Sequence, residues 1–128
     1  MPSSNSGQVC YAIERVYAHD SLYDSLVEEF RAQAAALKRS NAAGDGGHYG
    51  PMIFDRQAAI IDGQLDDAVK KGASIVLGGR SERVNGAVWI DPTIVTNVDY
   101  TMTLMTEETF GPIVPVMCFS DDTEDVRR

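Results

Sequence analysis

Cys10 is the residue of this sequence best suited to nucleophilic chemistry. Gly7 lies three residues earlier and lets the backbone approach a ligand closely, and the turn around Cys10 is predicted to lead into a short helical stretch. A thiol just before a helix feels the partial positive charge of free backbone N–H groups, which lowers its pKa and raises the thiolate fraction. The backbone N–H of Cys10 could also donate to an oxyanion on the carbonyl that the sulfur attacks.

The alternative for any unpaired cysteine is a buried structural role, because cysteine is among the most buried residue types. We expect that role for Cys118, which lies inside the apolar run 113–119. Two cysteines form at most one bridge, so the sequence does not indicate a disulfide scaffold, and a reducing, cytoplasmic setting is the default.

A second candidate site is the run Glu107-Glu108-Thr109-Phe110-Gly111-Pro112. Two acids before an aromatic residue and a Gly-Pro turn make a loop that can present a carboxylate and a ring together. A carboxylate is suited to accept hydrogen bonds from ribose hydroxyls, and an aromatic ring can pack on a flat heterocycle. The structural alternative is a solvated acidic loop with Phe110 tucked into the core.

The two sites together resemble a known family. Asn5-x-Gly7-Gln8-x-Cys10 is similar to the cysteine motif of the aldehyde dehydrogenase superfamily, and Glu108-x-Phe110-Gly111-Pro112 is similar to its Glu-x-Phe-Gly-Pro motif, 98 positions further on. The segments between them resemble the family as well: Gly50-Pro51-Met52-Ile53, a helix from Gln57 to Gly72, Gly78-Gly79, and Asp91-Pro92-Thr93. The resemblance covers nearly the whole chain from Asn5 onward.

This resemblance implies a role for each site residue. Cys10 would be the nucleophile, forming a thiohemiacetal with a small-molecule aldehyde, and a thioester after hydride transfer to the nicotinamide. Glu108 would bind the nicotinamide ribose of NAD or NADP, and Phe110 would contact the nicotinamide end. The parent enzyme would be a homo-oligomer. Tyr11 departs from the family, which more often has a smaller residue there, and narrows the expected site.

The resemblance also implies that much of such an enzyme lies outside these 128 residues. The family's general-base glutamate, its oxyanion-hole asparagine and its nucleotide-binding domain all precede the cysteine motif. No Gly-x-Gly-x-x-Gly fingerprint or Walker-type loop occurs in the chain. We therefore expect residues 1–128 to be a partial catalytic domain, truncated where a helix starts near Asp121, without the nucleotide-binding domain and inactive in isolation.

Helical and strand patterns alternate along the chain, which favours an α/β fold with a mostly parallel sheet flanked by helices, as in the core of that catalytic domain. Helices are expected from Ser21, with Asp24 completing a capping box, and from about Asp55 to Lys71. Strands are expected at residues 15–19, 74–77, 88–90, 93–96 and 113–119. Residues 74–77 read as a buried strand, and Pro115 places the last strand at a sheet edge or a bulge.

The overall charge and hydropathy exclude two classes of partner. The formal net charge is −8 and no cluster of Lys and Arg occurs, which argues against nucleic acid. The longest apolar run has seven residues, far fewer than the roughly 20 that a membrane span needs. No Cys-x-x-Cys or His-x₃-His pair indicates a metal site.

Two further functions stay open at this point. A cysteine-dependent hydrolase would need His19 or His48 beside Cys10, and such a site is recognised by geometry rather than by sequence position. A non-catalytic interaction module would instead use exposed apolar faces to bind other chains.

Overall fold

A four-stranded sheet forms the centre of the molecule in the computed structural model, which describes residue 8, residues 14–41 and residues 44–120. The strands lie in the order β1–β6–β5–β2. Their bounds are Val16–His19 for β1, Ile113–Phe119 for β6, Thr93–Thr96 for β5 and Ser74–Leu77 for β2. β6 runs parallel to both β1 and β5, and only β2 is antiparallel. The α/β class and the mostly parallel sheet that we predicted are confirmed.

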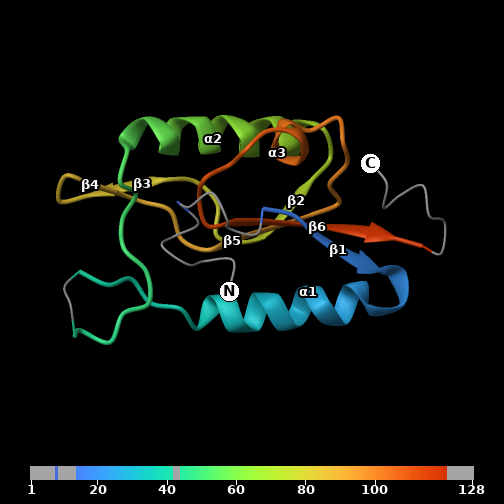
Figure 1. Ribbon diagram of the computed structural model, residues 1–128, viewed down its shortest axis with the longest axis horizontal. Coiled ribbons are helices and arrows are strands. Elements are labelled where there is room, and N and C mark those ends of the chain that lie inside the picture. Colours follow the sequence, from blue (N-terminus) through green and yellow to red (C-terminus); the bar gives the residue numbers. More distant parts are fainter. Residues whose placement is uncertain (1–7, 9–13, 42–43, 121–128) are drawn as a thin grey trace.

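Helices cover both faces of this sheet (Figure 1). The helix α1 (Asp20–Ala35) lies on one face, and α2 (Asp55–Lys70) lies on the other together with the short α3 (Thr103–Thr106). Successive strand residues face opposite sides, as the pleat requires. Ile94 and Val116 belong to the cluster under α1, whereas Val95 and Ile113 belong to the larger cluster under α2 and α3.

The helix α1 begins one residue earlier than predicted. His19 is its N-cap, and the His19 ring nitrogen Nδ1 accepts the backbone N–H of Ser21 at 3.2 Å. The expected capping box of Ser21 and Asp24 is therefore wrong, because the imidazole already satisfies the N–H group that a cap must serve. None of the residues of α1 is buried, and Leu22 is 62% exposed, so its predicted apolar face is only half covered in this chain.

The helix α2 has the predicted start and ends with its C-cap at Lys71, before Gly72, whose φ of +107° suits a helix end. Its buried face is narrower than predicted. Ile61 and Leu65 are almost completely buried, whereas Ile60 and Val69 are 41% and 49% exposed.

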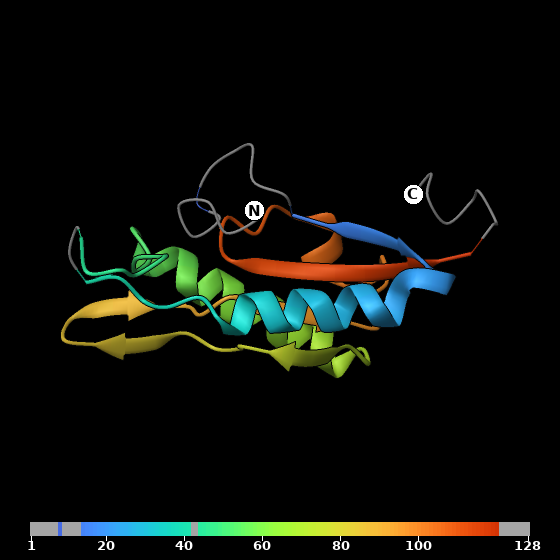
Figure 2. The ribbon, with the colours of Figure 1, turned by 90° about the horizontal axis from the view of Figure 1, so that it is seen from below.

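A β-hairpin that we did not predict projects from one end of the molecule (Figure 2). It consists of β3 (Glu82–Val84) and β4 (Ala87–Trp89). Asn85 and Gly86 form its two-residue turn with φ values of +50° and +83°, as a type I′ turn requires. The strand β4 was predicted near its observed position. The Asn85-Gly86 pair is a typical hairpin turn, and it could have indicated that a second strand, β3, precedes it.

The strand β6 lies inside the sheet and both of its ladders keep their register, so neither the sheet edge nor the bulge that we predicted at Pro115 is found. The strand β6 pairs with β5 over Ile113–Pro115 and with β1 over Val116–Phe119. Pro115 therefore lies where one ladder ends and the other is about to begin, a position at which a missing backbone N–H costs little. The edge strands are β1 and β2. The residues of β2 are exposed or half-buried, so it is not the buried strand that we predicted.

Cys118 is exposed, which corrects its expected burial. The cause is that β6 pairs with β5 up to Pro115 and with β1 after it. Residues beyond Pro115 have β1 beside them but no longer pair with β5, so burial falls from Val116, which is fully buried, toward the end of the strand.

Candidate active site

The segment that carries Cys10 is attached to two separate parts of the fold. Cys10 and Tyr11 lie outside the described residues, but Gln8 and Glu14 on either side are described. The Gln8 side-chain carbonyl accepts the backbone N–H of Ile53 at 2.7 Å. Ile53 belongs to the Gly50–Ile53 segment that was singled out in the sequence. Glu14 contacts the loop 107–112, which holds the other two predicted site residues.

Glu14 binds two consecutive backbone amides of that loop. The N–H groups of Thr109 and Phe110 both donate to Oε1 of Glu14, at 3.0 and 3.2 Å. The next residue along the chain, Arg15, donates from Nε to the carbonyl of Met105 at 2.7 Å, and its Nη2 lies 3.5 Å from the carbonyl of Glu107. The start of β1 is therefore fastened to the loop by both side chains.

Two glutamines of α2 hold the same loop from the opposite side. Gln57 donates to the carbonyl of Thr109 at 2.6 Å, and Gln64 donates to the carbonyl of Glu108 at 3.3 Å. We did not predict either glutamine. A signal existed, because both lie on the apolar face of α2 with Ile61, and a buried amide needs a partner.

The loop backbone is therefore held by several side chains, while its two predicted binding groups stay at least partly exposed. Glu108 is exposed, Thr109 is 2% exposed, and Phe110 is half-buried. Phe110 has a φ of +55°, in the left-handed region that non-glycine residues seldom adopt. Such outliers persist where the surrounding structure over-determines them, and they cluster at functional sites. An exposed carboxylate and a partly exposed ring are what a ligand-binding loop needs.

Pro112 connects this loop to the sheet. Its carbonyl accepts the backbone N–H of Thr93 at 2.9 Å, which starts the alignment of β5 beside β6. Gly111, one residue earlier, packs closely on the side chain of Ile61. The last residues of the Glu-x-Phe-Gly-Pro motif therefore serve the packing of the loop on α2 and the sheet.

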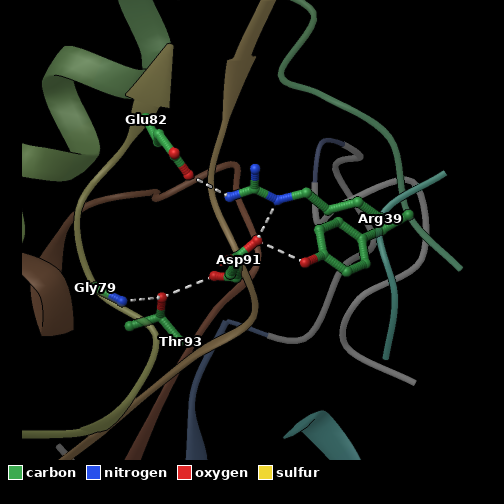
Figure 3. A network of polar contacts seen from close by, with 6 residues as sticks. Arg39, Gly79, Glu82, Asp91 and Thr93 are labelled. Carbon is green, nitrogen blue, oxygen red and sulfur yellow. Dashed lines mark hydrogen bonds and ion pairs between the residues drawn. The ribbon is translucent and has the colours of Figure 1, made fainter. Parts of the chain in front are cut away.

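A polar network positions the Gly50–Ile53 segment, to which Gln8 is bound (Figure 3). Asp91 accepts hydrogen bonds from Nε of Arg39 at 2.8 Å and from the hydroxyl of Tyr49 at 2.6 Å, and Arg39 also pairs with Glu82. The Arg39 guanidinium lies 5.1 Å from the centre of the Trp89 ring. Arg39 and Tyr49 are thereby held against the hairpin and against Asp91, which precedes β5.

Electrostatics in this network follow from its contacts. The hydrogen bond from Arg39 holds the pKa of the Asp91 carboxyl below its ordinary value, with Tyr49 adding to the effect. Burial raises the pKa of Tyr49 to about 12, and its hydrogen bond to Asp91 acts in the same direction. Asp91 is therefore ionised and Tyr49 neutral at neutral pH.

The two histidines make contacts within the fold: the ring of His19 packs edge-on against that of Phe119, and each imidazole accepts one backbone N–H. Nδ1 of His19 caps α1, and Nδ1 of His48 accepts the backbone N–H of Lys38 at 2.9 Å. Within residues 14–41 and 44–120 there is no cluster of three His, Cys, Asp or Glu side chains that could hold a metal ion. No helix in that same part of the chain is long and apolar enough to cross a membrane.

Comparison with known proteins gives a consistent picture. The model of the aldehyde dehydrogenase family matches residues 2–128. The mitochondrial aldehyde dehydrogenase of Leishmania tarentolae is 38% identical over 97% of this chain and 25% of its own length. The glutarate-semialdehyde dehydrogenase of Pseudomonas putida is 37% identical over 94% of this chain and 24% of its own length.

Solved structures agree. The lactaldehyde dehydrogenase of Escherichia coli superposes with a TM-score of 0.89 at 33% identity, covering 98% of this chain and 26% of that one. The betaine aldehyde dehydrogenase of Staphylococcus aureus, solved in complex with NAD+, superposes with a TM-score of 0.86 at 28% identity. The match covers 96% of this chain and 25% of that one. The chain thus spans about a quarter of the length of these relatives.

Proposed function

This chain belongs to the aldehyde dehydrogenase family, and on that premise we propose that it is part of the catalytic domain of an enzyme that oxidises a small-molecule aldehyde to a carboxylate with NAD or NADP. Loop 107–112 carries the proposal. Its backbone is held from α2 and from the start of β1, while Glu108 stays exposed and Phe110 only half-buried. The loop is attached through Glu14 to the chain that follows Cys10.

In the proposed reaction Cys10 is the nucleophile. Its thiolate adds to the aldehyde carbonyl, and the oxygen takes up a proton to give a thiohemiacetal. Loss of a hydride from the former aldehyde carbon and of the proton from its hydroxyl leaves a thioester on Cys10, and water cleaves the thioester to the carboxylate and the free thiol. Cys10 lies outside the described residues, so the support for this role comes from the family resemblance.

Glu108 and Phe110 are proposed to hold the nicotinamide end of the cofactor. An exposed carboxylate can accept hydrogen bonds from the two ribose hydroxyls, and the Phe110 ring can pack against the flat nicotinamide. The bound cofactor supplies the hydride acceptor. The complex of the Staphylococcus aureus relative with NAD+ supports a nicotinamide cofactor for this family member too.

The proposal extends to the whole enzyme and to the 128 residues in isolation. It acts as a homo-oligomer in the cytoplasm, although relatives named mitochondrial show that the family works in more than one compartment. The 128 residues alone are proposed not to turn over aldehydes, because the groups that hold the rest of the cofactor and activate water lie outside them.

A chimera tests this function. Residues 2–128 would replace the matching quarter of the Escherichia coli lactaldehyde dehydrogenase, which has the same fold over this region. We expect aldehyde-dependent NADH formation that Cys10→Ala abolishes and that Glu108→Ala weakens about tenfold in KM for NAD, equivalent to about 1.4 kcal/mol. Cys118→Ser is the matched control and should leave the rate unchanged.

Two results would overturn the proposal. One is a folded chimera, shown by circular dichroism and by the oligomer size of the host, that forms NADH equally well with Cys10→Ala. The other is a folded chimera that binds NAD yet oxidises none of a panel of short aldehydes. A hydrolase would instead release product from activated esters through Cys10 with no need for NAD, and an interaction module would do neither.

A further inference from the structure

We propose that Glu14 is a positioning residue of this active site: its carboxylate orients the backbone between Glu108 and Phe110 and so sets where both side chains stand. The inference rests on the proposed roles of Glu108 and Phe110. Glu14 lies outside both sequence motifs, and only its contacts in the fold point to it.

The geometry at Glu14 is that of an anion bound by backbone amides. Thr109 and Phe110 aim their N–H groups at one oxygen, Oε1, at 3.0 and 3.2 Å. Backbone concavities in which successive N–H groups point to the same side bind anions. Phe110 has the left-handed φ of +55°. A carboxylate is therefore the group that stabilises the unusual backbone at the residue predicted to contact the nicotinamide.

The other anchors of the loop do not duplicate this contact. Gln57 and Gln64 bind the carbonyls of Thr109 and Glu108 from the side of α2, and so leave the N–H groups to Glu14. The peptide backbone at Thr109 is thus held at its N–H by the start of β1 and at its carbonyl by α2. Removing the Glu14 carboxylate should leave the loop in place but release the N–H ends of the two peptide planes on either side of Thr109.

Glu14 also couples the two halves of the proposed site. It follows Cys10 by four residues, which limits the distance between their Cα atoms to roughly 14 Å. Glu14 therefore lies within this distance of Cys10 while it binds the loop that carries Glu108 and Phe110. This is the physical basis for expecting Glu14 to affect cofactor binding although it belongs to neither motif.

Hydrogen exchange in the 128-residue chain tests the contact itself. In Glu14→Ala, the amides of Thr109 and Phe110 should exchange at least tenfold faster than in the wild type. In Glu14→Gln, whose amide oxygen can still accept both bonds, they should exchange within about threefold of it. The Thr93 amide, bound to the Pro112 carbonyl, is the internal reference. Glu107→Ala, which removes an exposed carboxylate from the same loop, is the matched control. Unchanged exchange in Glu14→Ala would overturn the inference.

Steady-state kinetics in the chimera test the consequence. Glu14→Ala should raise KM for NAD about fivefold with a smaller change in kcat, and Glu14→Gln should restore most of the loss. In the Glu14→Ala, Glu108→Ala double variant the effects should combine to less than their product, because Glu14 acts through the placement of Glu108.

Failure of this inference can be distinguished from failure of the proposed function. If the effects of Glu14→Ala and Glu108→Ala on KM for NAD simply multiply in the double variant, the positioning role is overturned even if the hydrogen bonds are present. An active Cys10→Ala chimera would overturn the proposed function and leave the exchange result standing. A loss in Glu14→Ala that the glutamine variant does not recover, together with a lowered melting temperature, would make Glu14 a stability residue only and would reject the inference.

Discussion

The backbone of Gly111 lies directly against the side chain of Ile61. A Cβ atom on residue 111 would overlap Cδ1 of Ile61, and Ile61 is fully buried on α2. The glycine of the Glu-x-Phe-Gly-Pro motif is therefore favoured by close approach to the helix, because any larger residue would force the buried Ile61 side chain to shift. The left-handed conformation in this loop belongs to its neighbour Phe110.

Gly111→Ala should lower the free energy of unfolding by about 1–3 kcal/mol, because the added methyl group overpacks a buried contact. Urea unfolding monitored by circular dichroism measures the change. Adding Ile61→Val should recover part of it, since valine lacks the Cδ1 atom that the methyl group would meet. A double variant no better than the sum of its parts would contradict the contact.

Gly63→Ala is the matched control for that substitution. Gly63 lies inside α2, and a Cβ there would have no heavy atom within 4 Å. Alanine should stabilise the helix by about 0.5–1 kcal/mol at this position. The same added methyl group should therefore change the free energy of unfolding in opposite directions at the two positions.

Tyr49→Phe should cost about 1 kcal/mol at neutral pH, because it removes a hydrogen bond to Asp91 from a buried ring. The cost should shrink at high pH. The pKa of Tyr49 in the fold is raised to about 12, above the value near 10 of an unfolded tyrosine. Its contribution is therefore complete below about pH 10 and is lost as the pH rises toward 12.

Urea unfolding of both proteins at pH 7, 9, 10.5 and 11.5 measures this difference. Subtracting the two proteins at each pH removes the titration of the lysines that they share. An equal difference at pH 7 and pH 11.5 would show that the phenol is not held neutral by its surroundings.

Cys10 should react faster with iodoacetamide than Cys118, and its advantage should increase from pH 8 to pH 6. Cys118 is exposed, so access alone does not protect it, and the comparison depends on thiolate fraction. Mass spectrometry after brief reaction measures both sites. Faster reaction at Cys118 at pH 6 would argue against Cys10 as an activated nucleophile, and Cys118→Ser removes the competing site.

The isolated 128-residue chain should show no measurable binding of NAD by calorimetric titration. One ribose contact through Glu108 and one ring contact through Phe110 contribute about 1–3 kcal/mol, less than the roughly 4 kcal/mol or more that association costs. Micromolar binding would show that these residues hold far more of the cofactor than proposed.

Much of the fold was predictable because it depends on local patterns. The start of α2 and the strands β2, β5 and β6 follow from apolar periodicity, Gly-bounded runs and β-forming residues, which act over a few neighbours in the chain. The family was also predictable, because the motifs at Cys10 and at Glu108 to Pro112 lie in a characteristic order and separation, and the match over residues 2–128 confirms it.

The sequence alone, then, determined the class of fold, the family and the two places where chemistry is expected. Tertiary structure decided the environment of each residue. Pro115 lies within the sheet and Cys118 is exposed because β6 changes partner between them, which no feature of the strand itself reveals. Glu14 meets Thr109 and Phe110 across more than 90 residues. Such contacts depend on which strands become neighbours, and that choice is made by the packing of the whole chain.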